Sequence, residues 1–142
     1  MTFLVERLAE LRRHLDHLYE VRPRVDSTRQ LETDLSLHND VLFSLLTVSQ
    51  LVIDISGEIS SQEGLPFDDY TSAVRNLARI PGFEESLVET LARLPGFRNV
   101  IMHEYVELDF DLVLEALNGL EPIEEFVKRV GRRLSEEGPH GP

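Results

Sequence analysis

The stretch VLFSLLTVSQLVIDISGEI, residues 41–59, decides the fold of this chain. Its apolar residues fall on nearly all faces of a helix, which is typical of a helix at the centre of a bundle or covered by a partner chain. Polar residues interrupt the run too often for a membrane span: Ser44, Thr47, Ser49, Gln50 and Asp54. We therefore expect a central helix of a soluble protein, with no membrane association.

Helical periodicity also fills the first part of the chain. Ahead of Pro23, apolar residues recur at three- and four-residue steps: Phe3, Leu4, Leu8, Leu11, Leu15 and Leu18. Ser27 and Gln30 fit a capping box, in which two side chains bond to unpaired backbone amides at a helix start. A long second helix is predicted from this box, and Gly64 and Pro66 end it.

The second half repeats the pattern of helix starts and breaks. Asp68 or Asp69 can cap a third helix, and Asp109 or Asp111 a last helix whose apolar stripe spans residues 112–130. Between the third and the last predicted helix lies a short repeat: LARIPGF, residues 77–83, and LARLPGF, residues 91–97. Each copy predicts a helix end followed by a Pro-Gly break. With no strand periodicity, the chain is predicted to be all-α, an antiparallel bundle of about five helices. We expect one domain over residues 1–135 and a disordered tail over 136–142.

Composition excludes several kinds of site. The 142 residues contain no cysteine, which rules out disulfides, thiolate metal sites and cysteine nucleophiles. Glycine-rich phosphate loops and the G-x-S-x-G turn are absent from the sequence. Glu6 and Glu10 interrupt the apolar N-terminus, so no secretory signal is predicted and we expect a cytoplasmic protein.

The charge distribution matters for a nucleic-acid partner. A formal net charge of -12 opposes phosphate binding. However, residues 30–70 carry eight acids and no base, whereas residues 71–105 carry four of each. If the chain binds RNA, the acids of residues 30–70 must face away from it or toward a positively charged partner.

The segment FRNVIMHEY, residues 97–105, is the richest in groups that perform chemistry. Arg98 supplies a planar cation suited to phosphate oxygens, and His103 can accept or donate a proton near neutral pH. Together they suit cleavage of RNA, whose 2′-hydroxyl is a built-in nucleophile, without a metal ion. A zinc site of the H-E-x-x-H type is excluded because Glu107 takes the place of the second histidine.

Structural interpretations of these residues remain open at this point. From chemistry alone, Arg98 and His103 more often belong to a capped and salt-bridged helix start than to a catalytic pair, and Tyr105 can be a core aromatic residue. Asp54 lies in a run too apolar for it and needs a partner if it is buried. Arg98 is one such partner, and a helix cap or a solvated exit from the bundle is the alternative.

The spacing of Arg98, His103 and Tyr105 resembles the R-x4-H-x-Y motif of HepT-like proteins of the HEPN superfamily. Gly-Phe-Arg-Asn before the histidine and Val-Glu-Leu-Asp after the tyrosine strengthen the match. The resemblance implies a HEPN-like up-and-down four-helix core and a homodimer. It also implies a metal-independent endoribonuclease site, between two protomers, with Arg98 and His103 as catalytic residues, Asn99 in support and no cofactor.

The resemblance further implies a toxin of a type VII toxin–antitoxin pair. Its partner would be a minimal nucleotidyltransferase antitoxin that transfers AMP to Tyr105, placing negative charge beside the RNA cleft. Two alternatives are non-catalytic. One is a HEPN module that docks a nucleotidyltransferase, and the other is an antitoxin or regulator that binds a basic protein through residues 30–70.

Overall fold

The structure, a computed structural model, describes residues 2–104 and 106–137, and every regular element in them is helical. The longer helices are α1 (Thr2–Val21), α3 (Leu35–Gln62), α6 (Leu94–His103) and α8 (Glu121–Glu137). The shorter ones are α2 (Thr28–Thr33), α4 (Tyr70–Arg75), α5 (Glu85–Leu91) and α7 (Phe110–Asn118), with 3-10 turns at Arg22–Arg24 and Asn76–Arg79. The predicted all-α fold is confirmed.

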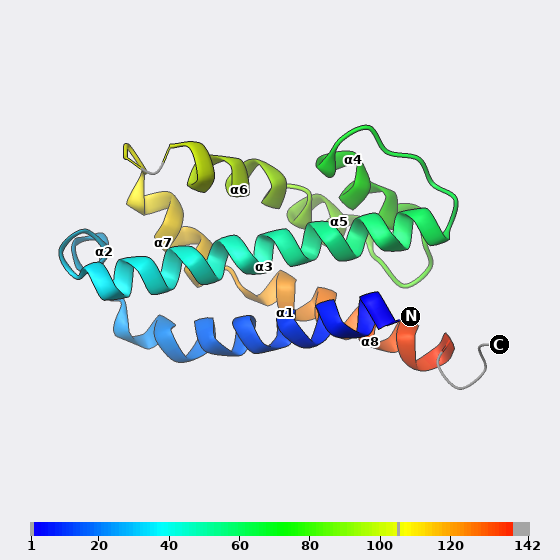
Figure 1. Ribbon diagram of the computed structural model, residues 1–142, viewed down its shortest axis with the longest axis horizontal. Helices are drawn as coiled ribbons and strands as arrows, with labels where there is room; N and C mark the ends of the chain where they lie inside the picture. Colours follow the sequence, from blue (N-terminus) through cyan, green and yellow to red (C-terminus); the bar gives the residue numbers. More distant parts are fainter. Residues whose placement is uncertain (1, 105, 138–142) are drawn as a thin grey trace.

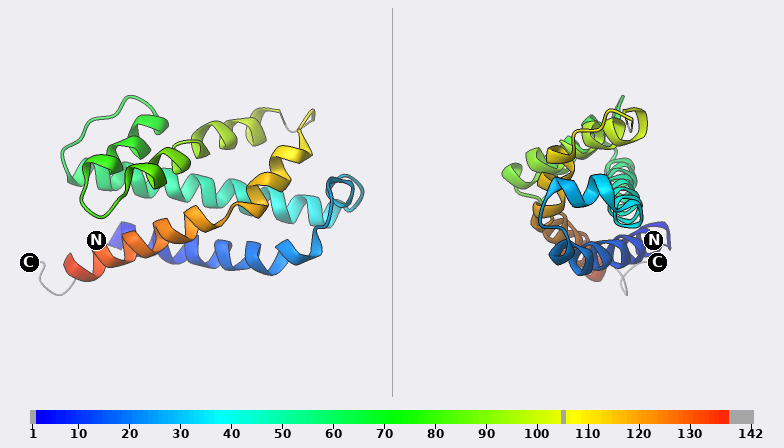
Figure 2. Two further views of the ribbon diagram at one scale, coloured as in Figure 1. Left: turned by 180° about the vertical axis from the view of Figure 1, so that it is seen from behind. Right: turned by 90° about the vertical axis from the view of Figure 1, so that its left-hand side faces the viewer.

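Helix α3 lies at the centre of the bundle. It packs against α1 on one side and α6 on the other, and α1 also packs against α8. Successive long helices run in opposite directions, and α7 and α8 lead the chain back along α1 (Figures 1 and 2). The core is thus an up-and-down arrangement of α1, α3, α6 and the α7–α8 pair.

The burial of α3 explains the apolar run that decides the fold. Side chains at several turns are fully covered, among them Val41, Val48, Val52, Ile55 and Ile59. By length and composition alone α3 could cross a membrane, but 56% of its most apolar window is buried inside the bundle. Its hydrophobicity is that of the central helix predicted from the sequence.

The prediction of one long second helix is wrong, because this part of the chain forms two helices, α2 and α3. The capping box forms as expected, and Gln30 accepts a hydrogen bond from the Ser27 amide at 3.1 Å. The chain then leaves helical geometry at Asp34, whose carboxylate accepts from the Leu37 amide at 3.1 Å and starts α3. Asp34 is itself a strong N-cap, so it begins a new helix instead of continuing the old one.

The predicted last helix and the second Pro-Gly break also need correction. Asp109 caps α7 as one of the two expected residues, but the helix ends at Gly119 and α8 begins afresh at Glu121. Pro95 lies in the first turn of α6, where its missing amide hydrogen costs nothing, so this copy of the repeat opens a helix. Helix α8 reaches Glu137, into the predicted tail, and residues 138–142 lie outside the described residues.

Candidate functional site

Arg98 lies near the middle of α6, half-buried against α3. Its Nε donates a hydrogen bond to Oε1 of Gln50, and its Nη1 donates to Oδ1 of Asn99 at 2.9 Å. The guanidinium carbon also lies 5.7 Å from the centre of the Tyr70 ring, within cation–π range. Three side chains therefore hold the guanidinium in place.

The guanidinium still has donors to offer. An arginine has five N–H groups, and in the described part of the chain no acceptor is bonded to Nη2 of Arg98. This edge can bind a phosphate oxygen without breaking the bonds that fix the side chain. The arrangement is that of a pre-positioned anion clamp.

Asp54 joins the site through Gln50. The Gln50 amide donates to Oδ1 of Asp54 at 2.8 Å while its carbonyl accepts from Arg98. Within residues 2–104 and 106–137 there is no ion pair between Asp54 and Arg98, so Arg98 is not the direct partner that the sequence allowed. Half-buried on α3, Asp54 orients the amide that in turn orients the arginine.

His103 is the last residue of α6 and is exposed. Its imidazole has no hydrogen-bond partner among the described residues, and Asn99, exposed one turn earlier, shares its face of the helix. Arg98 and His103 are about 7.5 Å apart along the helix axis and about 140° apart around it. A single copy therefore presents the two groups on different sides of α6. Tyr105 lies outside the described residues.

An exposed surface connects these residues with apolar side chains. We define the α3–α6 surface as Phe43, Gln50 and Asp54 on α3 with Arg98 and Met102 on α6. Phe43 lies two turns before Gln50, and Met102 one turn after Arg98, so each pair shares a helix face. The exposed fractions of Phe43 and Met102, 63% and 42%, are high for large apolar residues. Because α3 and α6 run in opposite directions, Met102 lies toward the Phe43 end of the surface (Figure 1).

Several acids of residues 30–70 are engaged away from Arg98. Asp34 and Asp69 cap α3 and α4. Asp40 is hydrogen bonded to His17, and Glu63 forms an ion pair with Arg133. Asp54 is the acid linked to the site, through Gln50. Thus the acid-rich segment does not turn all its charge toward the arginine.

A metal centre has no ligand set in the described ranges. Within residues 2–104 and 106–137, no three histidine, aspartate or glutamate side chains come together as a metal ion would require. What these residues do bring together is a fixed arginine with open donors and an exposed histidine on one helix.

Comparison with known proteins identifies the family. Residues 6–130 match the family described as Ribonuclease HepT-like. The chain belongs to this family. It is 25% identical over 130 residues to the mRNA nuclease HepT of Shewanella oneidensis, a match that covers 87% of this chain and 92% of that protein. It is 31% identical over 120 residues to a candidate RNase of Archaeoglobus fulgidus, covering 84% of this chain and 91% of that one.

Solved structures show the same fold. One is a tri-AMPylated HEPN toxin of Shewanella oneidensis in complex with its MNT antitoxin, with a TM-score of 0.77 and 23% identity. That match covers 91% of this chain and 96% of the toxin. Another, a toxin–antitoxin structure with AMP-PNP, has a TM-score of 0.78 and 22% identity, and covers 90% and 95% of the two chains. This HepT-like chain therefore has the HEPN-type bundle that its motif predicts.

Gln50 and Tyr70 are site residues that the sequence analysis did not assign. Gln50 was visible only as one of the polar interruptions of the central apolar helix. Its spacing of four residues from Asp54 is a usable signal, because it puts both polar side chains on one face of the helix. Tyr70 gave no comparable signal, since its contact with Arg98 depends on how the loop after α3 returns to α6.

Proposed function

We propose that this HepT-like protein is the toxin of a toxin–antitoxin pair, acts in the cytoplasm and cleaves RNA without a metal ion. The observation that carries the proposal is the environment of Arg98. Three neighbours hold its guanidinium in place, and among the described residues its Nη2 has no hydrogen-bond partner. Its helix also carries an exposed histidine, five residues later. Membership of a ribonuclease family supports the same chemistry.

In the proposed reaction Arg98 binds the non-bridging oxygens of the scissile phosphate. His103 takes the proton from the ribose 2′-hydroxyl, the 2′-oxygen attacks phosphorus, and the bond to the 5′-oxygen breaks. A second acid protonates that leaving oxygen, and the products are a 2′,3′-cyclic phosphate and a 5′-hydroxyl. The arginine stabilises the charge that builds up on the phosphate oxygens as the new bond forms.

A homodimer would supply both proton-transfer groups. In one copy Arg98 and His103 point to different sides of α6, whereas a cleft between two copies would hold two arginines and two imidazoles. One imidazole would act as base and the other as acid. The exposed Phe43 and Met102 on the α3–α6 surface are suitable contacts for such an interface.

The test is cleavage of RNA by the purified chain in excess chelator. Replacing Arg98 or His103 by alanine should each lower the rate by about 10²–10⁴-fold, the usual contribution of a charge clamp or a general base. Arg79→Ala is the matched control, since Arg79 is an exposed arginine of the second 3-10 turn. No cleavage above the level of the two variants would leave the non-catalytic HEPN module as the better explanation.

We also propose that a minimal nucleotidyltransferase antitoxin transfers AMP to Tyr105. Support comes from the motif position of Tyr105 and from similarity to a HEPN toxin solved as a tri-AMPylated complex with an MNT antitoxin. Phosphates added two residues from His103 would repel RNA. Co-expression with such an enzyme should raise the intact mass by whole AMP units, and Tyr105→Phe should abolish the first addition. An unchanged mass, or the same addition to Tyr105→Phe, would contradict this assignment.

A further inference from the structure

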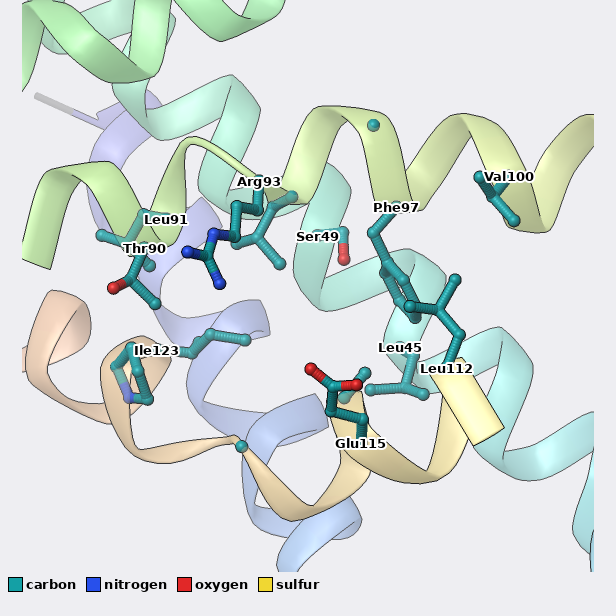
Figure 3. Close-up of a pocket in the computed structure, with 15 residues that line it drawn as sticks. Leu45, Ser49, Thr90, Leu91, Arg93, Phe97, Val100, Leu112, Glu115 and Ile123 are labelled. Carbon is teal, nitrogen blue, oxygen red and sulfur yellow. The ribbon is translucent and has the colours of Figure 1, made fainter. Parts of the chain in front are cut away.

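A cavity of about 460 Å³ lies on a part of the bundle that the proposed reaction does not use. It opens between α3, α6, α7 and the start of α8, and none of Arg98, His103 and Asp54 lines it (Figure 3). Its volume falls within the range of small-molecule sites in proteins. The cavity therefore needs an explanation separate from RNA cleavage.

The walls of the cavity are mostly hydrocarbon. Five helices contribute side chains to it: α3, α5, α6, α7 and α8. Its apolar lining includes Leu45, Phe97, Leu112 and Ile123. In Figure 3 the Phe97 ring points from α6 toward Leu45 and Leu112 on the opposite side. Such a lining favours a ligand whose body is apolar and compact.

One polar group is buried in this apolar wall. The Ser49 side chain lies in the cavity wall, its Oγ is almost closed off from solvent, and the residue is only 1% exposed (Figure 3). Among the residues that the structure describes, its Oγ has no hydrogen-bond partner. Buried hydroxyls are nearly always paired, because leaving one without a partner is destabilising. A bound molecule with a polar head would satisfy this oxygen.

Two opposite charges face the cavity from opposite walls. Figure 3 shows the Arg93 guanidinium pointing in from the start of α6 and the Glu115 carboxylate pointing in from α7. Both residues are exposed, and in the described part of the chain neither side chain takes part in an ion pair or hydrogen bond. The cavity thus offers one cation and one anion above an apolar interior.

We propose that this cavity binds a small zwitterion with an apolar body, of the class of free aromatic or branched aliphatic amino acids. The ligand carboxylate faces Arg93, its ammonium faces Glu115, and its side chain lies among Leu45, Phe97 and Leu112. The Ser49 hydroxyl hydrogen bonds to the polar head. A nucleotide fits less well, because it would bring several negative charges to a site with one arginine and a facing glutamate.

The test compares three ligands that share one ring. L-Phenylalanine carries both charges, 3-phenylpropionate lacks the ammonium, and 2-phenylethylamine lacks the carboxylate. Titrated into the isotopically labelled full chain, L-phenylalanine should shift the NMR signals of Ser49, Leu45 and Ile123. It should bind about tenfold more tightly than either analogue, since each analogue loses one charged contact. L-Leucine, a zwitterion with a branched aliphatic body, should shift the same signals.

Charge-removing variants assign each end of the ligand. Arg93→Gln should remove the preference for L-phenylalanine over 2-phenylethylamine and keep the preference over 3-phenylpropionate. Glu115→Gln should do the reverse, and Arg79→Gln, an exposed arginine away from the cavity, should change neither. Both cavity substitutions are at exposed positions, so the fold is expected to survive them.

Three results would overturn the proposal. The first is no shift of these signals by either amino acid up to its solubility limit. The second is equal binding of the three phenyl ligands, and the third is shifts confined to the α3–α6 surface. Ser49→Ala gives a further measurement: it should raise the melting temperature of the unliganded chain and weaken L-phenylalanine binding several-fold. Unchanged binding by this variant would remove Ser49 from the site.

Discussion

Among single residues, the proposed reaction depends most on how Arg98 is held. Gln50 uses both ends of its amide, accepting from Arg98 Nε and donating to Asp54. Arginine has a long and flexible side chain, so fixing it before substrate arrives removes an entropic cost from the reaction. We therefore propose that Gln50 is a positioning residue, which acts on the proposed reaction through Arg98.

Gln50→Ala should lower RNA cleavage about tenfold by releasing the arginine, with most of the loss in kcat. The free energy of unfolding should change by less than about 1 kcal/mol, since Gln50 is half-buried at the edge of α3. Single-turnover cleavage and urea unfolding measure the two effects. Thr47→Ala, also half-buried and three residues earlier on α3, is the matched control. A rate equal to that of the unaltered protein would show that Gln50 does not position Arg98.

The residues of the candidate motif were easier to predict than the residues that hold Arg98 in place. Arg98, Asn99 and His103 are close in sequence, so helix geometry alone places them on neighbouring turns. The groups that hold Arg98 come from α3 and from the start of α4, far away along the chain. Such contacts depend on tertiary packing, which periodicity does not encode.

At the scale of helices, α1 and α8 are joined by an ion pair of good geometry. Arg12 Nη1 and Nη2 each donate to a different oxygen of Glu124 at 2.6 Å. The hydrogen bonds from Arg12 lower the pKa of Glu124 below its ordinary value. The pKa of Arg12 is raised chiefly by the same hydrogen bonds. Both shifts favour the charged forms in the folded state.

Glu124→Gln should reduce the free energy of unfolding by about 1 kcal/mol near neutral pH, a modest value because solvent partly screens the pair. The folded pKa of Glu124 is lowered, so its contribution is present above the unfolded pKa of about 4.3 and is lost as the pH falls through the folded pKa. Urea unfolding should therefore show a difference near pH 7 that shrinks toward pH 3.

Glu121→Gln is the control for this measurement, because Glu121 is more exposed and contacts Arg22 through one bond at 3.2 Å. It should change stability less at every pH. A Glu124→Gln effect that stays constant down to pH 3 would contradict the assigned pKa shift.

The sequence predicted which segments are helical better than it predicted where each helix begins and ends. The caps at Asp69 and Asp109 form where the sequence allows them. The breaks at Asp34 and Gly119 were missed because the apolar periodicity continues across both positions. Local capping chemistry ended helices that the longer-range pattern would have continued.

At the scale of the whole molecule, the proposed site needs a second copy. Phe43, the aromatic residue of the α3–α6 surface, is 63% exposed. Covering it would remove apolar area from water two turns of α3 before Gln50, the residue that bonds to Arg98. We propose that a dimer interface at Phe43 is coupled to the reaction at Arg98.

Phe43→Glu should convert a dimer into a monomer at micromolar concentration, because it places like charges opposite each other across a twofold interface. Helical circular dichroism should stay unchanged, and RNA cleavage should fall with the dimer fraction. Multi-angle light scattering measures the mass, and Val5→Glu on α1, where Val5 is 49% exposed, is the control. A monomeric unaltered protein that still cleaves RNA would refute the shared cleft.

We propose that Arg98 and His103 direct the ribose 2′-hydroxyl onto the adjacent phosphate. The most direct measurement compares an oligoribonucleotide with the same oligomer carrying one 2′-deoxy sugar at the cleavage position, in excess chelator. We predict a 2′,3′-cyclic phosphate product from the first and no cut at that bond in the second. Arg98→Ala and His103→Ala should each cleave the first about 10²–10⁴-fold more slowly than the unaltered protein. Equal cutting of the two oligomers, or full activity of either variant, would contradict the claim.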